Sequence, residues 1–317
     1  MEELRQSSLL VTGGTGSFGR AFVRYALDNL DPQRIAILSR DELKQSEMRL
    51  DFEGDSRLRW FLGDIRDHSR LERAFHGVDY VVHAAALKQV DTAEYNPFEF
   101  VKTNVLGSQN VIDAAIDCGV KKVIALSTDK ASSPINLYGA TKLTSDKLFV
   151  GANNYSGKAG TLMSVVRYGN VMGSRGSVIP LFRHLVAQGQ PLPITDPDMT
   201  RFWITIDQAV RFVVDSLTDM RGGELYVPRL PSMRLLDLVE AIAPKHPLNY
   251  VGIRPGEKLH EEMISADDAP RTYRQETRYV IAPTSGEWGF NVPEGQLVEE
   301  GFSYRSDIND QWMTTEE

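Results

Sequence analysis

The chain has 317 residues, with 43 acidic and 35 basic side chains and a formal net charge of −8. This acidic balance excludes a general electrostatic attraction to nucleic acid or to an anionic membrane, and the single cysteine, Cys118, excludes a disulfide within the chain. No apolar run approaches the roughly 20 residues that span a bilayer, so we predict a cytoplasmic globular protein with no membrane and no nucleic-acid partner.

The first half of the chain alternates short apolar runs with amphipathic stretches, the pattern of strands followed by helices. The connections are short, which is typical of a parallel sheet covered by helices on both faces. We therefore predict the α/β class, with a Rossmann doubly wound parallel sheet. The expected strands are Leu9–Thr12, Arg34–Leu38, Leu58–Leu62, Tyr80–His83, Val123–Ser127 and Leu162–Tyr168, and the expected helices are Gly16–Leu27, Asp41–Asp51, Ser69–Phe75, Val101–Cys118 and Leu137–Asn153.

The pattern changes after Tyr168, where loops and prolines interrupt the alternation. We predict a smaller, discontinuous α/β substrate lobe of about residues 169–201 plus 228–317, beside an NADP-binding domain of residues 1–168 plus about 202–227. The ligand site is expected in the cleft between the two. The elements expected here are the helices Val178–Gln188, Thr205–Leu217 and Arg234–Ala243, the strand Glu224–Val227, and an irregular stretch marked by Pro191, Pro193 and Pro197.

A glycine-rich turn follows the first expected strand and opens the first expected helix, with the spacing G-x-x-G-x-x-G. Glycine permits a tight turn and close approach of the backbone to a pyrophosphate, and a helix N-terminus supplies N–H groups and partial positive charge. Such a motif alone would also fit a plain loop, but its position between strand and helix favours dinucleotide binding. The cofactor-binding residues expected here are Gly13, Thr15, Gly16, Ser17, Phe18 and Gly19.

The end of the second expected strand distinguishes NADP from NAD. A carboxylate there would accept hydrogen bonds from a ribose 2′-hydroxyl and favour NAD, but the chain has Ser39 and Arg40, with Lys44 one turn later. A guanidinium and an ammonium suit a 2′-phosphate, so we predict NADP; the alternative is a solvated basic helix start. The cofactor-binding residues expected from this turn are Ser39, Arg40, Asp41, Glu42, Leu43, Lys44 and Gln45.

Two further strand ends are expected to contribute to the cofactor site. Asp64 and Ile65 follow the third strand, where an adenine ring could be held, although Asp64 could equally be a helix cap. Ala84 and Lys88 follow the fourth strand, and Lys88 stands where ligands bind in such sheets. His83 fits a packed histidine at a strand end better than a catalyst.

Two pairs of residues carry the predicted chemistry. Tyr138 and Lys142 are four residues apart and share one face of a helix. A phenol has a pKa near 10 and needs a nearby cation to act as a base at neutral pH; otherwise Tyr138 would be a core aromatic. Asp129 and Lys130 follow a strand and form either an acid–base pair or a surface ion pair.

The glycine turn together with Tyr138-x-x-x-Lys142 resembles the extended short-chain dehydrogenase/reductase family. Within it the chain is similar to the inverting UDP-N-acetylglucosamine 4,6-dehydratases, which begin pseudaminic acid biosynthesis. The matching motifs span positions 12 to about 261, most of the chain. They are Thr12–Gly19, Ser39–Gln45, His83–Lys88, Glu94–Pro97, Ser127–Lys142, Arg167–Val171, Gly173–Ser177, Met199–Thr205 and Gly252–Glu261.

The resemblance implies a role for each catalytic residue. Tyr138 removes the proton of the C4 hydroxyl, Lys142 binds the nicotinamide ribose and lowers the Tyr138 pKa, and Thr128 helps to hold the substrate oxygen. Lys130 is expected as the base for H5 and Asp129 as the acid for the C6 hydroxyl, although these two roles could be exchanged. The NADP is then recycled within each turnover and stays tightly bound.

The resemblance also implies the partners. The substrate is UDP-N-acetylglucosamine, and the chain is expected to form a homo-oligomer, either a dimer or a hexamer. Arg201 and Arg254 suit the diphosphate, and His260–Glu261 lacks the second histidine of a zinc motif, so no metal is expected. The expected substrate-binding residues are Lys88, Asn170, Val178, Thr195, Arg201, Arg254 and Glu257, and Val171 is expected to contact the cofactor together with Lys88, Tyr138 and Lys142.

Three alternatives remain open at this point. The first is another sugar-nucleotide enzyme, either a UDP-hexose 4-epimerase or a different UDP-sugar 4,6-dehydratase/5-epimerase; an epimerase would need no Asp–Lys pair and would release no water. The second is a non-catalytic NADP-binding regulator, which would be expected to lack Tyr138 or Lys142. The third is a reductase that consumes NADPH in each turnover.

Overall fold

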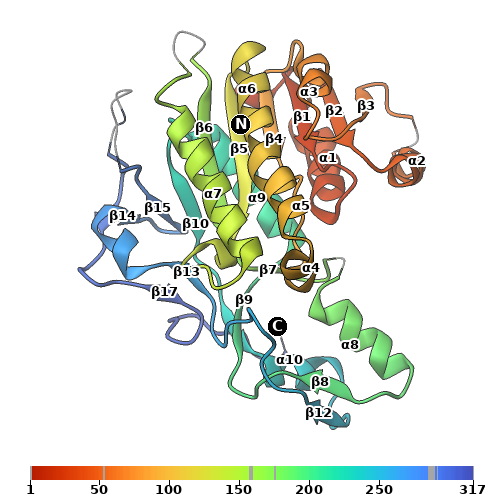
Figure 1. The fold of residues 1–317 in the computed structure, drawn as a ribbon, viewed down its shortest axis with the longest axis vertical. Coiled ribbons are helices and arrows are strands. Elements are labelled where there is room, and N and C mark those ends of the chain that lie inside the picture. The colour runs from red at the N-terminus through yellow and green to blue at the C-terminus, as the bar shows by residue number, and fades with distance from the viewer. Residues whose placement is uncertain are drawn as a thin grey trace.

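The centre of the computed structural model is a run of seven parallel strands in the order β3-β2-β1-β4-β5-β6-β10 (Figure 1). The structure describes residues 2–52, 54–156, 160–174, 176–284, 290 and 292–316. The chain winds from β1 outward to β3, then returns and continues from β4 in the other direction, which confirms the predicted doubly wound sheet. The strands are β1 (Ser8–Thr12), β2 (Arg34–Ser39), β3 (Leu58–Leu62), β4 (Tyr80–His83), β5 (Lys122–Thr128), β6 (Leu162–Tyr168) and β10 (Leu225–Pro228).

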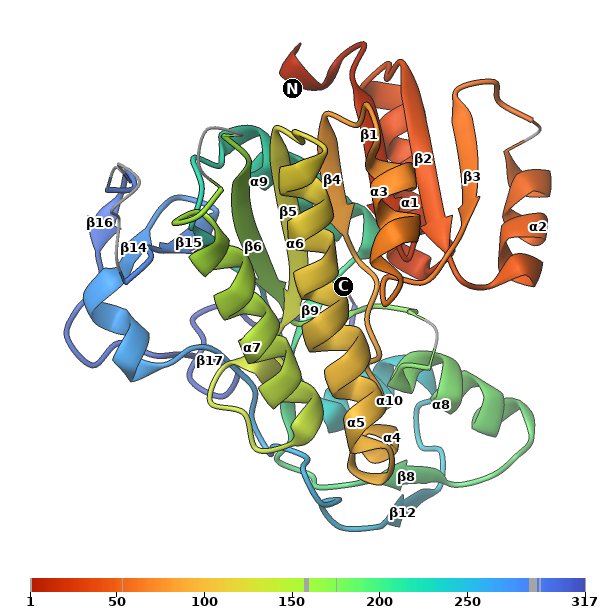
Figure 2. The same ribbon diagram turned by 45° about the horizontal axis from the view of Figure 1, so that its top comes forward.

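Helices cover both faces of this sheet, as Figure 2 shows, and the inner strands are therefore buried on both sides. The helices α3, α6 and α7 pack together on one face, and α1 and α9 pack against each other on the opposite face. The predicted helices that correspond to α1, α2, α3, α7 and α9 are confirmed to within a few residues. The bounds of the helices in the structure are α1 (Ser17–Asn29), α2 (Glu42–Asp51), α3 (His68–Phe75), α6 (Gly107–Asp117), α7 (Leu137–Ala152) and α9 (Ile206–Asp219).

The expected helix Val101–Cys118 differs in the structure. Pro97 begins a short helix, α5 (Pro97–Phe100), because proline is well suited to the first helical position. A π-helical segment, η2 (Val101–Leu106), then leads into α6. A further helix, α4 (Val90–Tyr95), was not predicted because it is only six residues long and carries no clear period.

The far edge of the large sheet corrects the predicted lobe boundaries. Beyond β10 the sheet continues with antiparallel strands, so that it has ten strands in the part of the chain that the structure describes. These strands come from a region that the sequence assigned to the smaller lobe, since its short polar runs gave no alternating pattern. They are β15 (Arg278–Ile281), β14 (Thr272–Arg274) and β16 (Gln296–Leu297), preceded by the 3-10 helix η5 (Ala266–Arg271).

The smaller lobe has a hydrophobic core of its own, which includes Phe182, Trp203 and Leu238. It lies below the carboxyl ends of the parallel strands in Figure 1. The stretch that the prolines marked as irregular contains a strand, β8, that pairs in parallel with β12. The elements of this lobe are β7 (Asn170–Val171), α8 (Val178–Ala187), β8 (Leu192–Ile194), β9 (Thr200–Ile204), β11 (Ser232–Arg234), α10 (Leu235–Ile242) and β12 (Leu248–Tyr250).

Two short strands connect the lobe to the large sheet. β13 (Glu262–Ile264) pairs with β17 (Tyr304–Arg305), and it lies beside the 3-10 turn η3 (Asp129–Ala131) that follows β5. A chain segment distant in sequence is thereby brought to the end of β5, where the predicted acid–base pair stands.

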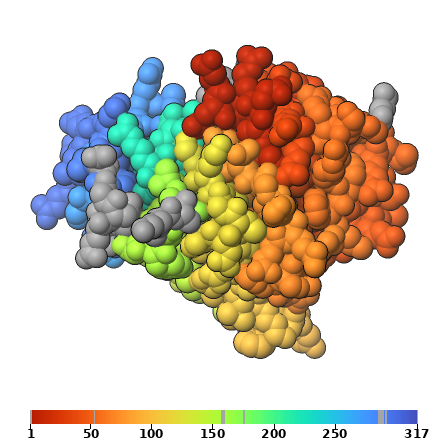
Figure 3. Space-filling model, turned by 90° about the horizontal axis from the view of Figure 1, so that it is seen from above, coloured from red at the N-terminus to blue at the C-terminus, as the bar shows by residue number. Residues whose placement is uncertain are grey.

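The N-terminal segment is fixed to the rest of the sheet domain, where Figure 3 shows it beside the segment near residue 220. It begins with a 3-10 turn, η1 (Glu2–Leu4). Lys122 Nζ donates to Glu3 Oε1 at 2.7 Å and to the Thr218 carbonyl at 2.9 Å, joining both segments to β5. Among the described residues, no helix has the length and apolar character needed to cross a bilayer.

Candidate active site

A cleft of about 1130 Å³ runs along the carboxyl ends of the parallel strands and between the large sheet and the smaller lobe. Most residues predicted from the sequence line it. They are Gly13, Thr15, Gly16, Ser17, Phe18, Gly19, Ser39, Arg40, Asp41, Lys44, Asp64, Ile65, Ala84, Lys88, Thr128, Lys130, Tyr138, Lys142, Asn170, Val171, Val178, Thr195, Arg201, Arg254 and Glu257. The cleft thus brings together residues from both halves of the chain.

Four predicted residues do not line the cleft. Glu42 and Leu43 lie on α2, where Leu43 is 69% exposed. Gln45 is buried, and its amide donates to the Ser39 and Phe61 carbonyls. These three positions were included because the motif is continuous in sequence, but a helix turns successive side chains to different sides. Asp129 is also buried, directly behind Lys130.

The glycine turn leaves no space for side chains. A Cβ atom on Gly13, which has φ of +66°, would lie 2.9 Å from the Ala85 backbone, and one on Gly19 would lie 2.4 Å from the Gly14 backbone. Gly16 is the N-cap of α1 and supplies no side-chain cap, and the first turn of this helix, Ser17 to Gly19, lines the cleft. These features fit a dinucleotide pyrophosphate.

Two cations stand at the end of β2, as the sequence predicted. Arg40 is half exposed and lies 3.8 Å from Asp64, and Lys44 pairs with Asp41 at 2.6 Å. Asp64 is not the cap of α3, because Asp67 has that role. Burial would raise the pKa of the Asp64 carboxyl, but its hydrogen bonds from Arg66 hold the pKa below its usual range.

Asn104, on the π-helical segment, was missed by the sequence analysis. Its side-chain oxygen accepts from Leu87 N at 2.9 Å, and its amide donates to the Leu87 carbonyl at 2.9 Å and to Thr141 Oγ1 at 3.1 Å. Asn104 therefore fixes the loop after β4 to α7, which carries Tyr138. A π-helical turn often marks a functional position, but the sequence showed no signal for it.

His83 is packed as predicted. Its Nδ1 lies 2.8 Å from Thr12 Oγ1, and its ring contacts Phe149. Burial lowers the pKa of His83 to about 3, so the ring is neutral at physiological pH. His83 holds β1 and β4 together beneath the site.

Tyr138 and Lys142 share the face of α7 that meets the cleft, as predicted. Burial raises the pKa of Tyr138 to about 12, while the charge of Lys130 and a hydrogen bond with Thr128 act to lower it. The sequence assigned this lowering to Lys142, but in the structure Lys130 provides it. The Lys142 ammonium donates instead to the Leu126 carbonyl at 2.8 Å.

Asp129 and Lys130 form an ion pair at the wall of the cleft rather than on the outer surface: Asp129 is buried, and the Lys130 side chain is 24% exposed. Lys130 Nζ lies 3.1 Å from Asp129 Oδ1 and 2.9 Å from Oε1 of a second carboxylate, Glu261. Burial would lower the pKa of Lys130, but the two carboxylates raise it above its usual range. Glu261 was noticed in the sequence only as part of an incomplete metal motif, since nothing in the sequence shows that it meets a residue 131 positions earlier.

The two arginines predicted for the diphosphate differ in their surroundings. The Arg201 guanidinium is largely buried and donates to the Thr200, Lys258 and Leu259 carbonyls. The Arg254 side chain is 61% exposed and pairs with Glu257 at 3.1 Å. Arg254 is therefore the better placed of the two to reach an incoming anion.

The close packing of α7 on the Asp129 turn positions these groups. Gly139 allows this contact, because a Cβ atom there would lie 2.1 Å from the Lys130 carbonyl oxygen. Asn136 caps α7 by accepting from Gly139 N at 2.8 Å, and its amide donates to the Gly256 carbonyl at 2.8 Å. Within the matching motif Gly173–Ser177, Arg175 lies outside the described residues.

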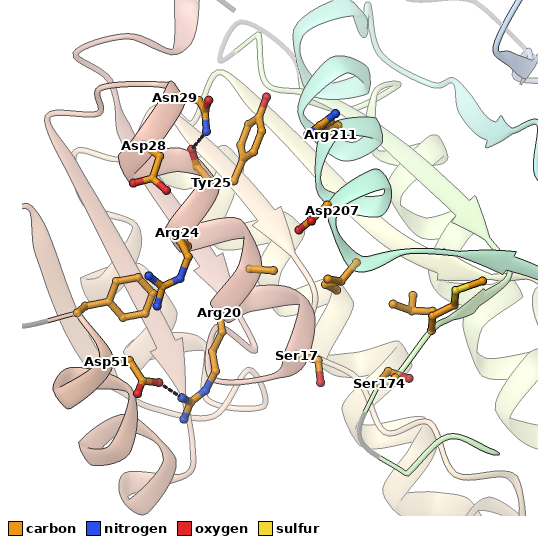
Figure 4. Close-up of a pocket in the computed structure, with 16 residues that line it drawn as sticks. Ser17, Arg20, Arg24, Tyr25, Asp28, Asn29, Asp51, Ser174, Asp207 and Arg211 are labelled. Carbon is orange, nitrogen blue, oxygen red and sulfur yellow. Dashed lines mark hydrogen bonds and ion pairs between the residues drawn. The ribbon is translucent and has the colours of Figure 1, made fainter. Parts of the chain in front are cut away.

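A second hollow, of about 530 Å³, lies between α1 and α9 (Figure 4). Several of its charged groups already have partners: Arg20 pairs with Asp51, and the Arg24 guanidinium stacks on Phe52 at 4.9 Å. Of the predicted site residues, Ser17 and Val171 reach both hollows. Of the proposed proton-transfer groups, Tyr138 and Lys130 line the large cleft, and Asp129 is buried next to Lys130.

The doubly wound sheet, the glycine turn and the paired Tyr138 and Lys142 define an extended short-chain dehydrogenase/reductase. These features are those of a nicotinamide dinucleotide site. The chain belongs to the family described as polysaccharide biosynthesis protein, whose model matches residues 9–283.

Curated proteins and solved structures similar to this chain include sugar-nucleotide 4,6-dehydratases. The chain is 53% identical to the UDP-N-acetylglucosamine 4,6-dehydratase (inverting) of Campylobacter jejuni subsp. jejuni serotype O:23/36 (strain 81-176), over 98% of this chain and 95% of the relative. The crystal structure of Pen from Bacillus thuringiensis has a TM-score of 0.91 and 35% identity, covering 100% of this chain and 97% of the other. DesIV, a dTDP-glucose 4,6-dehydratase from Streptomyces venezuelae solved with NAD bound, has a TM-score of 0.72 and 28% identity, covering 80% and 86%.

Proposed function

We propose that this protein converts UDP-N-acetylglucosamine into UDP-2-acetamido-2,6-dideoxy-β-L-arabino-hexos-4-ulose, a 4,6-dehydration with inversion at C5. We further propose that this is the first step of pseudaminic acid biosynthesis. The observation that carries the proposal is the ion pair between the buried Asp129 and Lys130, which lines the dinucleotide cleft together with Tyr138. Simple hydride transfer at C4 needs only a base such as Tyr138, whereas loss of water across C5 and C6 needs a second acid and base. The similarity to the Campylobacter jejuni enzyme supports the same substrate.

Each proton-transfer step of the proposed reaction is assigned to one residue. Tyr138 takes the proton of the C4 hydroxyl, with Thr128 holding its phenol. A nicotinamide cofactor held by the glycine turn and Lys142 would supply a reversible hydride acceptor for C4 and C6. Lys130 takes H5, which the C4 ketone acidifies, and Asp129 protonates the C6 hydroxyl as it leaves as water. C5 is then reprotonated from the opposite face, and no net oxidation results.

The charge environment supports Asp129 as the acid. Burial and the neighbouring Glu261 charge raise the pKa of the Asp129 carboxyl above its usual range. A raised pKa favours the protonated carboxyl, which is the form that can donate to a leaving hydroxyl. Lys130 can accept H5 only as a free amine, so its base form must arise by loss of the ammonium proton.

The substrate diphosphate is assigned to Arg254, with Glu257 available for ribose hydroxyls. Lys88 and Asn170 stand at the inner wall of the cleft, and Val178 and Thr195 come from the smaller lobe. Burial lowers the pKa of Lys88. We assign Arg201 a supporting role, since its guanidinium is occupied by three carbonyls.

The cofactor is proposed to be NADP, because Arg40 and Lys44 stand at the end of β2. Arg40→Ala is expected to weaken NADP binding by about tenfold or more, the loss of a charged hydrogen bond to a phosphate, and to change NAD binding little. The measurement is a fluorescence titration of both cofactors. Arg66→Ala is the matched control, since Arg66 pairs with Asp64 but does not line the cleft. An equal loss for both cofactors would remove Arg40 as the 2′-phosphate ligand.

The assembly is proposed to be a homo-oligomer, a dimer or a hexamer, in the cytoplasm. Large apolar side chains are exposed along α4, α5 and η2, namely Tyr95, Phe98 and Leu106, and a surface of this kind is typical of an interface. Light scattering after size-exclusion chromatography measures the mass directly. A monomer at micromolar concentration would contradict the proposal.

The direct test of the proposed function is proton NMR of the purified protein with UDP-N-acetylglucosamine in deuterated water, without added reductant. The expected result is a new C6 methyl signal, deuterium at C5 and an L-arabino ring. A methyl product with unchanged C5 configuration would mean a retaining dehydratase. A galacto product without a methyl signal would mean an epimerase.

A further inference from the structure

We propose that Glu261 is a positioning residue of the dehydration step, which holds the Lys130 ammonium beside Asp129 and fixes the charge of that pair. This inference rests on the proposed function. Its place beside Lys130 is visible only in the folded chain. Its side chain is 1% exposed, and so is that of Asp129.

The backbone of Glu261 is fixed from two sides, so its carboxylate has a defined position. Glu261 N donates to Ser306 Oγ at 2.9 Å, and Ser306 N donates to the Glu261 carbonyl at 2.9 Å. The preceding residue, His260, forms a bridge with Thr200 at the start of β9. The segment thus sits between β9 and the C-terminal part of the chain, next to the Asp129 turn (Figure 1).

The Asp129 turn is fixed independently by the next residue of the same segment. Ser132 Oγ and Ser133 Oγ donate to Glu262 Oε2 at 3.0 and 2.6 Å. Glu262 therefore anchors the turn, whereas Glu261 reaches the Lys130 ammonium. Two adjacent carboxylates on one segment have different tasks, which makes Glu262 a matched control for Glu261.

Two buried carboxylates share one ammonium, and they share it unequally. Glu261 Oε1 lies 2.9 Å from Lys130 Nζ and 3.6 Å from Arg201 Nε. Among the described residues, Asp129 pairs with one cation, Lys130 at 3.1 Å, and its Oδ1 also accepts from Thr128 Oγ1 at 2.9 Å. Asp129 Oδ2 and Glu261 Oε2 have no hydrogen-bond partner among the residues that the structure describes. Two adjacent ionised carboxylates repel each other in a buried site, so the one with fewer cations keeps a proton more readily.

The ionisation of each group agrees with this geometry. Burial and the Glu261 charge raise the pKa of the Asp129 carboxyl. Burial would also raise the pKa of Glu261, but Lys130 and Arg201 lower it below its usual range. Glu261 is thus the permanent anion of the site. The other charged or titratable groups near the cluster are Lys88, Tyr138, Arg201, Lys258 and Glu262.

Glu261→Gln tests the charge of this residue while keeping its shape. A glutamine oxygen can still accept from Lys130 Nζ, but the negative charge is lost. Removal of a negative charge makes both Asp129 and Lys130 more acidic, so both limbs of the pH profile of kcat should shift to lower pH by about one unit. KM for the sugar nucleotide should not change. Glu262→Gln should leave the profile in place, and an unshifted Glu261→Gln profile would overturn the proposal.

Glu261→Asp tests position while keeping the charge. The carboxylate retracts by one carbon–carbon bond, so the pH profile should stay while kcat falls by about 10- to 100-fold, the loss expected when a catalytic group is displaced by about 1 Å. Glu240→Asp is the control, since Glu240 is exposed on α10 and does not line the cleft. This variant also keeps the proposal testable if Glu261→Gln fails to fold. A wild-type kcat in Glu261→Asp would overturn the positioning role.

A measurement without substrate separates this inference from the proposed function. In protein labelled with carbon-13 at aspartate carboxyl groups, Asp129 should titrate at lower pH in Glu261→Gln than in the wild type or in Glu262→Gln. An unchanged Asp129 titration would overturn the inference even if the wild type dehydrates UDP-N-acetylglucosamine. A wild type that forms no methyl product would contradict the proposed function, and the Asp129 titration would still decide the role of Glu261.

Discussion

Tyr138→Phe is expected to reduce the rate of C4 oxidation by about 10²- to 10⁴-fold, the usual contribution of a general base. The ring and its edge contact with Phe100 remain in the variant, so folding and cofactor binding should be retained. The measurement is single-turnover formation of the reduced nicotinamide, followed by absorbance. No methyl product should form, because H5 becomes acidic only after C4 is oxidised.

The pH dependence gives a second readout of Tyr138. Burial raises its pKa to about 12, so the phenolate fraction, and with it the wild-type rate of C4 oxidation, should rise with pH through the neutral range. Tyr138→Phe should lose this dependence. Tyr80→Phe is the control, since Tyr80 is also buried but lies at the start of β4, away from the cleft. A Tyr138→Phe variant that oxidises C4 at the wild-type rate would exclude Tyr138 as the base.

Lys130→Ala is expected to block the elimination of water, a later step than the C4 oxidation that Tyr138→Phe slows. Removal of the H5 base should slow elimination by about 10²- to 10⁴-fold, while C4 oxidation continues. Oxidation should also slow somewhat, because the Lys130 charge acts to lower the Tyr138 pKa. Reduced cofactor should therefore accumulate on the protein without a methyl product, and C5 should keep its proton in deuterated water.

The control for this variant is Lys147→Ala. Lys147 lies on α7 and its amine is partly buried, but it does not line the cleft. Proton NMR of both variants with UDP-N-acetylglucosamine distinguishes the steps. If Lys130→Ala dehydrates at the wild-type rate, the H5 base is another group, and the exchange of roles with Asp129 becomes the first alternative to test.

Local sequence patterns were enough to predict the parallel part of the large sheet and most of the residues that line the cleft at its glycine turn. Hydrophobic periodicity predicted the first six strands to within a residue or two at each end, because strands buried on both faces appear as short apolar runs. The glycine spacing and the pair Tyr138 and Lys142 depend on local geometry: a turn that excludes side chains, and a helix face. Interactions over a few residues are encoded locally and can be read from a short stretch of sequence.

Contacts between segments distant in the sequence became visible only in the folded chain. Glu261 meets Lys130 across 131 positions, and Asn104 clamps the loop after β4 through a π-helical turn. In the structure the cation that acts to lower the pKa of Tyr138 is Lys130 rather than Lys142. Strands β14 to β16 belong to the large sheet rather than to the smaller lobe. These features depend on packing between segments far apart in the chain. No local period encodes such contacts, because each side chain acquires its partner and its charge environment only when the fold is complete.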